Sequence, residues 1–370
     1  MGHQQSDDLD YYIKEAEEFE ATKAGVKGLV DSGIKKIPKF FIQESGTLSK
    51  TTSKNAMQLP QVPIIDLKGI DDGFQRAQIL EEIREASENW GFFQIINHGV
   101  SQNVMHAILE ATRRFHEQPK EAKMELYSPD ARQQVRFFSI NGLFRETHCA
   151  DWRDVFACNF LDDALDTEAA IPEICRNDTL DYMENMMKVR DLLSEILSEA
   201  LGLDKDYLDG INCLKSEYLT CLYYPACPEP HFTIGSHKHS DSTFMTVLVQ
   251  DNMGGLQVLY QNDWIDVTPL PGALVVNIGE LIQLITNDKF KSVEHRVLAS
   301  YQGPRISVGC FFYPSSQCMM KPYGPIKELL SDSNPPIYKE VTYLEYIHQY
   351  RKMAREQNQT LPHFKLYNDC

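Results

Sequence analysis

The stretch FMTVLVQDNMGGLQVLYQNDWIDVTPLPGALVVNI, residues 244–278, indicates the fold class of this chain. It contains short runs of β-branched, aliphatic and aromatic residues, and the turn sequences DNMGG and LPG separate these runs. Short strands at such regular spacing are typical of an antiparallel sandwich or barrel. Similar β-prone runs flank the stretch, at residues 218–224, 295–298 and 306–313. We therefore predict a β-sandwich, and we favour a jelly roll because its two sheets leave an open mouth for a small ligand.

The N-terminal half follows a helical period instead. Apolar residues recur at helical spacing within residues 72–90, 101–115 and 180–201. Thr342 and Glu345 form a capping box that predicts one more helix near the C-terminus. The chain is thus predicted to be an α+β protein with four parts: a helical extension and loop at 1–60, a helix-rich region at 61–210, a jelly-roll core at 211–345, and a C-terminal helix and tail at 346–370.

The composition narrows the classes of partner. The 370 residues carry a formal charge of −17, and an acidic surface repels nucleic acid and anionic membrane. No segment reaches the roughly 20 consecutive apolar residues that a membrane-spanning helix needs. The nine cysteines form no C-x-x-C pair and mostly lie among apolar residues, as reduced core thiols in a reducing compartment do. We therefore expect a cytoplasmic monomer that binds neither nucleic acid nor membrane.

A cluster of potential metal ligands occurs in the string GSHKHSD, residues 235–241. In a strand the side chains of His237, His239 and Asp241 all point to one face, so two of them can chelate one ion. His295 lies in a second strand-like run and can supply a further ligand. Two histidines and one carboxylate on one side of an ion leave positions open for O₂ and a co-substrate, which favours Fe(II). A catalytic zinc site and a purely structural pair of histidines remain alternatives.

A candidate anion receptor follows in the run RIS, residues 305–307. Arg305 and Ser307 face the same side of an apolar strand, where a guanidinium needs an anion. A forked guanidinium with a hydroxyl beside it binds a carboxylate well, and Tyr224 is a further donor. 2-Oxoglutarate fits, because its 2-oxo acid end can chelate iron while its distal carboxylate meets Arg305. The alternative is a structural ion pair between Arg305 and an acidic residue of the protein.

Taken together, these motifs resemble the plant 2-oxoglutarate/Fe(II)-dependent dioxygenase superfamily over about residues 22–345. The matching strings are VPIIDL (62–67), WGFFQIINHGV (90–100), YYPACPEP (223–230), HSD (239–241), PGALVVNIG (271–279), NDKFKSVEHRV (287–297) and RIS (305–307). Two further strings, TKAGVKGLVDSG (22–33) and YGPIKELL (323–330), are similar to the subgroup called 1-aminocyclopropane-1-carboxylate oxidase homologues.

The resemblance implies a fold and a set of site residues. The fold is a distorted double-stranded β-helix (jelly roll) core flanked by helices. The resemblance assigns Fe(II) to His239, Asp241 and His295 and leaves His237 outside the ligand set. It assigns 2-oxoglutarate to Tyr224, Arg305 and Ser307. Two departures from the family pattern are Leu222, where many relatives carry Asn, and the divergent tail at 349–370.

The resemblance also implies a reaction. Members of this subgroup oxidise plant specialised metabolites such as alkaloids, and they couple the oxidation to decarboxylation of 2-oxoglutarate to succinate. We therefore expect an oxidoreductase that hydroxylates, O-demethylates or desaturates a small metabolite with O₂, with ascorbate as reductant. The alternatives are an ascorbate-dependent 1-aminocyclopropane-1-carboxylate oxidase-type enzyme, a gibberellin or flavonoid oxidase, and a binding module that has lost catalysis.

The substrate pocket is predicted from alternation and from the resemblance. Counting in steps of two along the strands of the anion receptor places Thr220, Phe311 and Tyr313 on the same face as Arg305 and Ser307. The aromatic string RFFSINGLF resembles the stretch that lines the pocket in relatives, and it contributes Phe138 and Phe144. These side chains favour an aromatic or polycyclic small-molecule substrate. The alternative is that the aromatic residues only fill the core.

Overall fold

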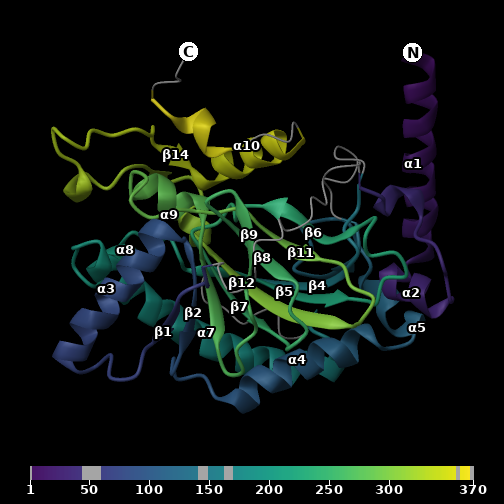
Figure 1. Cartoon of the computed structure of the whole chain (residues 1–370), viewed down its shortest axis with the longest axis horizontal. Helices are drawn as coiled ribbons and strands as arrows, with labels where there is room; N and C mark the ends of the chain where they lie inside the picture. Colours follow the sequence, from purple (N-terminus) through teal and green to yellow (C-terminus); the bar gives the residue numbers. More distant parts are fainter. Residues whose placement is uncertain (1, 44–59, 141–148, 162–169, 356–358, 367–370) are drawn as a thin grey trace.

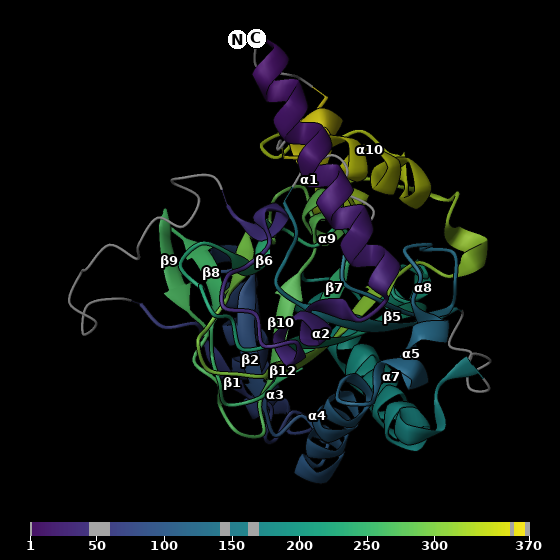
Figure 2. The ribbon, with the colours of Figure 1, turned by 90° about the vertical axis from the view of Figure 1, so that its right-hand side faces the viewer.

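The computed structural model describes residues 2–43, 60–140, 149–161, 170–355 and 359–366. Two β-sheets form its centre, and helices cover one side of the larger sheet (Figure 1). In Figure 2 the larger sheet lies between the strands β6, β8 and β9 on one side and helices α4 and α7 on the other. No described helix is long and apolar enough to cross a membrane.

The larger sheet has eight strands in the order β1-β2-β10-β7-β12-β5-β4-β3. Its strands are β1 (Ile64–Asp66), β2 (Phe92–Ile96), β3 (Val135–Phe138), β4 (Asp154–Phe160), β5 (Ser216–Tyr224), β7 (Met245–Gln250), β10 (Leu274–Ile278) and β12 (Arg305–Tyr313). The smaller sheet has the order β6-β11-β8-β9. Its strands are β6 (Ile234–His239), β8 (Leu256–Tyr260), β9 (Asp263–Asp266) and β11 (His295–Leu298). A separate pair joins β13 (Pro322–Tyr323) and β14 (Val341–Thr342).

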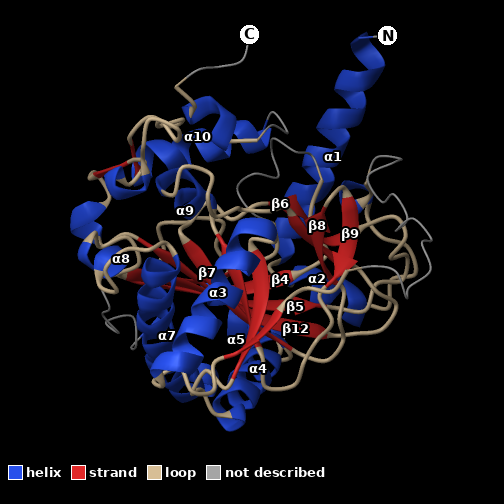
Figure 3. Ribbon diagram, turned by 60° about the vertical axis from the view of Figure 1, so that its left-hand side comes forward, coloured by secondary structure: helices blue, strands red, loops and turns tan. Residues whose placement is uncertain are grey.

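The helices lie mainly around the larger sheet (Figure 3). They are α1 (Gly2–Thr22), α2 (Gly25–Asp31), α3 (Gly73–Asn89), α4 (Gln102–His116), α5 (Lys120–Lys123), α7 (Glu173–Ala200), α8 (Tyr207–Gly210), α9 (Glu280–Ile285) and α10 (Tyr343–Arg355). Helix α4 contacts β5 and β12 directly and packs on α7, which also contacts α3.

Alternation along the strands gives the larger sheet two buried faces. On β4, Phe156 and Cys158 belong to the core shared with α4 and α7, and we call this the outer face. Val155 and Ala157 point the other way, into a second core that includes Val297 of the smaller sheet. We call this side, which looks toward the smaller sheet, the inner face. A ligand between the two sheets therefore meets every second residue of each strand.

Most predicted elements are present, and two differences have physical causes. Helix α7 begins at Glu173, earlier than the predicted residue 180, because Pro172 occupies its N-cap position. Strands β3 and β4 were not predicted from sequence. They extend the sheet because β4 pairs with β5 along its whole length, from Asp154 opposite Tyr223 to Phe160 opposite Glu217. The eight cysteines of the described residues form no disulfide bond with one another.

Candidate active site

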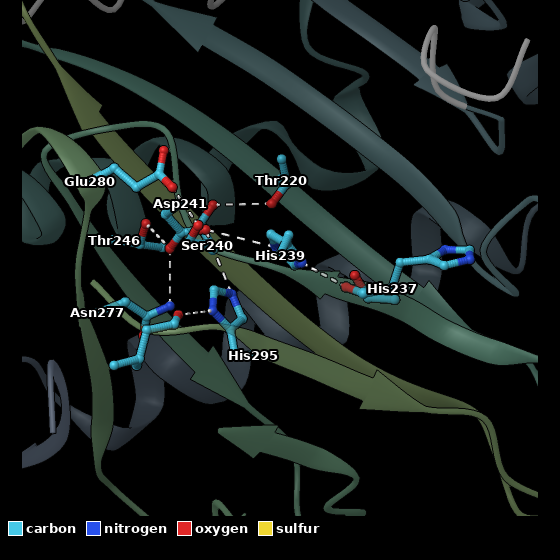
Figure 4. A network of polar contacts seen from close by, with 12 residues as sticks. Thr220, His237, His239, Ser240, Asp241, Thr246, Asn277, Glu280 and His295 are labelled. Atoms are coloured by element: carbon cyan, nitrogen blue, oxygen red, sulfur yellow. Dashed lines mark hydrogen bonds and ion pairs between the residues drawn. The ribbon is translucent and has the colours of Figure 1, made fainter. Parts of the chain in front are cut away.

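Three potential metal ligands meet where the smaller sheet faces the larger one (Figure 4). His239 ends β6 and His295 begins β11, and the two residues are direct partners in the antiparallel register. Asp241 follows β6 and reaches between them. Its Oδ1 lies 3.8 Å from Nε2 of His239 and 3.6 Å from Nε2 of His295. Three ligand atoms from three side chains thus lie within 4.8 Å of one another.

Backbone carbonyls orient both imidazole rings. Nδ1 of His239 lies 2.7 Å from the carbonyl oxygen of His237, and Nδ1 of His295 lies 3.3 Å from that of Val293. A carbonyl only accepts, so each Nδ1 carries a proton and each Nε2 is the nitrogen left to bind a metal ion beside Asp241. Burial lowers the pKa of His239 to about 4, with a further contribution from His295. The ring is therefore neutral at physiological pH, the state that binds a metal ion.

The carboxylate of Asp241 is fixed from the opposite side. Its Oδ2 accepts hydrogen bonds from Oγ1 of Thr246 at 2.7 Å and from Nδ2 of Asn277 at 3.1 Å. Burial alone would raise the pKa of Asp241, but the two neighbouring histidines and these two donors lower it. The carboxylate is therefore ionised, and only Oδ1 is left to face the histidines. Such bonds to a ligand carboxylate orient it for metal binding.

His237 does not share the face of His239 and Asp241, so the prediction of a common face was wrong. Strand β6 ends at His239, and its register with β11 shifts between Ser236 and His239, which indicates a β-bulge. An extra residue in one strand breaks the simple alternation of side chains. The ring of His237 points away from the cluster and pairs with Asp151 instead (Figure 4).

A buried polar network holds the loop between the two ligands His239 and Asp241. The hydroxyl of Ser240 donates to Glu280 at 2.6 Å, and the hydroxyl of Tyr346 on α10 donates to the same carboxyl group. Tyr350, also on α10, donates to the carbonyl oxygen of Ser240 at 2.9 Å. Burial raises the pKa of Glu280 to about 7. The C-terminal helix thus contacts the metal-ligand loop, which the sequence did not reveal.

The predicted anion receptor is assembled on the inner face. Arg305 on β12 lies opposite Tyr224 on β5, with its guanidinium carbon 4.9 Å from the centre of the tyrosine ring. The guanidinium donates to Oγ of Ser307 at 2.9 Å, to Oε1 of Gln250 at 3.0 Å and to the carbonyl oxygen of Gly254 at 2.7 Å. All three acceptors are uncharged, and the side chain is buried. Within the described residues, the alternative of a structural ion pair is therefore not realised.

These groups fit Fe(II) and 2-oxoglutarate. Two imidazole nitrogens and one carboxylate oxygen approach from one side, which is the donor set of Fe(II) oxygenases. The buried guanidinium of Arg305 has no protein anion of its own among the described residues, and a distal carboxylate of the co-substrate would supply one.

The predicted substrate residues lie on the same inner face. Thr220 pairs with Gly309, and Phe311 pairs with Tyr218 in the register of β5 and β12. Tyr313 stacks on Tyr343 of α10 with ring centres 5.6 Å apart. Phe138 lies on β3, with the guanidinium carbon of Arg136 4.1 Å from its ring centre. Phe144 lies outside the described residues.

Sequence reasoning missed Thr246, Asn277 and Gln250. Each is a polar side chain within an apolar strand, on the inner face, and each contacts Asp241 or Arg305. The sequence contains a signal for them, because each is a polar residue inside the otherwise apolar strings MTVLVQ and LVVNI. A polar residue at a buried strand position needs a partner, and here the partner is a site residue.

Comparisons with known proteins agree with this geometry. Residues 211–314 match the 2OG-Fe(II) oxygenase superfamily, and residues 62–176 match the family described as non-haem dioxygenase in morphine synthesis N-terminal. The chain is 46% identical over 362 residues to 1-aminocyclopropane-1-carboxylate oxidase homolog 11 of Arabidopsis thaliana, covering 97% of this chain and 98% of that protein. It is 44% identical over 361 residues to deacetoxyvindoline 4-hydroxylase of Catharanthus roseus, covering 96% of this chain and 90% of that protein.

A solved structure shares the architecture. The crystal structure of JOX2 in complex with 2OG, Fe and JA is 34% identical in sequence, with a TM-score of 0.73, and covers 91% of this chain and 94% of that chain. The chain belongs to the 2OG-Fe(II) oxygenase superfamily. It is a 2-oxoglutarate-dependent dioxygenase that uses Fe(II) and 2-oxoglutarate, and the predicted jelly-roll fold is confirmed.

Proposed function

We propose that this dioxygenase hydroxylates a small, largely apolar plant metabolite with an aromatic or polycyclic body. His239, Asp241 and His295 hold the iron, and Tyr224, Arg305 and Ser307 hold 2-oxoglutarate. Fe(II) and 2-oxoglutarate together supply the O₂-derived oxidant, with decarboxylation of 2-oxoglutarate to succinate. O-demethylation or desaturation of the same substrate class is the alternative outcome.

One observation carries the assignment of the site. Two Nε2 atoms lie 3.6–3.8 Å from one carboxylate oxygen, and the adjoining inner face holds a buried guanidinium that has no protein anion among the described residues. A zinc hydrolase would explain the first feature but would have no need of Arg305. A dicarboxylate co-substrate explains both, because its two ends meet the metal ligands and the guanidinium.

The chain itself contributes position rather than redox chemistry. Two carbonyl groups keep both imidazoles in the tautomer that directs Nε2 to the metal, and Thr246 and Asn277 keep Asp241 ionised and correctly turned. Arg305 and Ser307 fix the co-substrate at its far end, so that its orientation is set before the substrate enters. Buried apolar side chains of the inner face, among them Leu222, Tyr224 and Val297, lie beside the site.

The substrate class rests on the inner face and on one relative. Phe138, Phe311 and Tyr313 offer aromatic surfaces, and Thr220 adds one small polar group. The relative named deacetoxyvindoline 4-hydroxylase shares 44% identity with this chain. Both observations support a rigid polycyclic or aromatic metabolite over a sugar or an amino acid.

A single incubation tests the proposal. The purified protein is mixed with Fe(II), 2-oxoglutarate, ascorbate and a plant metabolite extract, and products are followed by mass spectrometry. We expect succinate together with a metabolite whose mass has increased by one oxygen atom. Phe311→Ala should weaken substrate binding and leave substrate-independent decarboxylation of 2-oxoglutarate unchanged. Product formation that does not require 2-oxoglutarate would instead support the ascorbate-dependent oxidase alternative.

A further inference from the structure

Three arginines lie on the inner face of the larger sheet, and they differ in whether a carboxylate of the protein pairs with the guanidinium. Arg153, immediately before β4, forms an ion pair with Asp151 at 2.8 Å. In the described part of the chain, the guanidinium of Arg305 donates only to uncharged groups, and it is the proposed receptor for 2-oxoglutarate. Arg136 on β3 lies opposite Ala157 of the inner core, so it belongs to the same face.

Arg136 is buried and has no ion pair among the described residues. Its side chain is 8% exposed. One terminal nitrogen donates to the hydroxyl of Tyr218 at 2.9 Å, and the other makes a long contact of 3.4 Å to the carbonyl oxygen of Pro129. The guanidinium carbon lies 4.1 Å from the ring centre of Phe138, and Nε has no hydrogen-bond partner in the part of the chain that the structure describes. The carboxylate of Asp130 interacts electrostatically with Arg136, but it makes no ion-pair contact with it and pairs with Arg132 at 2.7 Å. Arg136 therefore resembles Arg305, a buried guanidinium with donors left for an anion that the described residues do not supply.

A line of small residues connects Arg136 with the metal site. The path crosses the sheet from β3 to β12. Arg136 on β3 lies opposite Ala157 on β4, and Ala157 lies opposite Thr220 on β5. Thr220 in turn lies opposite Gly309 on β12. The neighbouring residue on that face of β12, Phe311, lies opposite Thr246, whose hydroxyl contacts Asp241. Three strand spacings of roughly 4.8 Å place Arg136 about 14 Å from β12 along the sheet.

We propose that Arg136 binds an anionic group of the substrate, and that the substrate class is an elongated aromatic or alicyclic monocarboxylate. The apolar body lies over the small residues between Phe138 and Phe311, and the carboxylate meets Nε and a terminal nitrogen of Arg136 side-on, as guanidinium and carboxylate pair in proteins. The opposite end of the substrate then lies toward the metal ligands. This inference rests on the proposed function and adds the charge and length of the substrate to it.

The test compares acids with their uncharged esters. The probes are 4-phenylbutyrate, 5-phenylvalerate and their methyl esters, and their binding to the Fe(II)- and 2-oxoglutarate-loaded protein is measured by calorimetry without O₂. We expect the wild-type protein to bind each acid at least about tenfold more tightly than its ester, because a charged hydrogen bond contributes that much. Arg136→Gln should remove this preference and leave the affinity for the esters unchanged, whereas Arg136→Lys should retain part of it.

Arg296 provides a matched control. It is also buried, donates to Gln257 at 2.9 Å and stacks on Trp264. It alternates with His295 and Val297 and so faces away from the inner core. Arg296→Gln should keep the preference for acids. The inference is overturned if Arg296→Gln loses the preference for acids as fully as Arg136→Gln does. It is also overturned if the wild-type protein binds acid and ester equally, and this comparison does not depend on the folding of any variant. Succinate formed in air without any probe reports separately on the proposed function.

Discussion

The carboxylate of Asp241 and the hydroxyl of Thr246 form a hydrogen bond of 2.7 Å between the metal-ligand loop and strand β7. The bond uses Oδ2 and so leaves Oδ1 facing His239 and His295. It also joins the two sheets, because the histidines belong to the smaller sheet and Thr246 belongs to the larger one. The geometry of the ligand cluster therefore depends on how the sheets pack.

Removing this bond should weaken metal binding without destroying the fold. In Thr246→Val, Asp241 loses its shorter hydrogen bond but keeps the one from Asn277. We expect the affinity for Fe(II) to fall by about 10- to 100-fold, the usual effect of losing a group that orients a metal ligand. Anaerobic titration with Fe(II) measures this. Thr243→Val is the matched control, because that buried hydroxyl has no hydrogen-bond partner among the described residues. An equal loss there would contradict the role of Thr246.

Substitution of a metal ligand should abolish iron binding and turnover, whereas substitution of the neighbouring His237 should not. His239→Ala and Asp241→Ala should each lose bound iron and all measurable turnover, because each removes one of three converging ligand atoms. His237→Ala should keep iron and measurable activity, since the carbonyl that orients His239 belongs to the backbone. Iron content by elemental analysis and succinate formation provide the two readouts. Equal iron loss in the His237 variant would show that the ligand assignment is wrong.

Arg305 should govern the affinity for 2-oxoglutarate. Arg305→Lys keeps the charge but loses the planar fork and its bonds to Ser307 and Gln250. A charged hydrogen bond contributes about 1.5–3 kcal/mol, so we expect the KM for 2-oxoglutarate to rise roughly 10- to 100-fold. Steady-state kinetics with varied 2-oxoglutarate measures this, with Arg296→Lys as the control. An unchanged KM would place the anchor elsewhere.

His116 should make the folded state sensitive to acid. It is fully buried on α4, and its Nε2 donates to the carbonyl oxygen of Cys221 at 3.1 Å. Burial, with a contribution from Lys123, lowers its pKa from 6.5 to about 3. The neutral form is therefore favoured by folding. The contribution of His116 to the free energy of unfolding is complete above pH 6.5 and is lost as the pH falls from 6.5 toward 3. Over that range the unfolded chain binds a proton that the folded chain excludes.

His116→Gln keeps a donor but cannot be protonated. We expect the variant to show a flatter dependence of unfolding free energy on pH between 6.5 and 4, with a difference of several kcal/mol at about 1.4 kcal/mol per pKa unit. Denaturant unfolding at a series of pH values measures the slope. His106→Gln on the exposed side of the same helix serves as the control. Parallel pH profiles for wild type and His116→Gln would contradict the prediction.

Local patterns in the sequence determined much of this protein. Turn residues and β-prone runs predicted β7, β8, β9 and β10, and the capping box of Thr342 and Glu345 is present with hydrogen bonds of 2.9 and 3.2 Å. Alternation predicted that Arg305 and Ser307 share a face, and they do contact each other. These features depend on residues close together in the chain, so a period of two or a turn sequence is enough to predict them.

Only the tertiary structure decided which residues meet from distant parts of the chain. Three features join segments that are far apart in sequence. The bulge in β6 turns His237 toward Asp151, and Tyr350 contacts the metal-ligand loop. Strand β3 pairs with β4, which in turn pairs with β5. Sequence periodicity gives the direction of a side chain relative to its own strand, but not the register or the neighbour of that strand. Those are set by which buried faces pack together and which polar groups are satisfied when the sheets close.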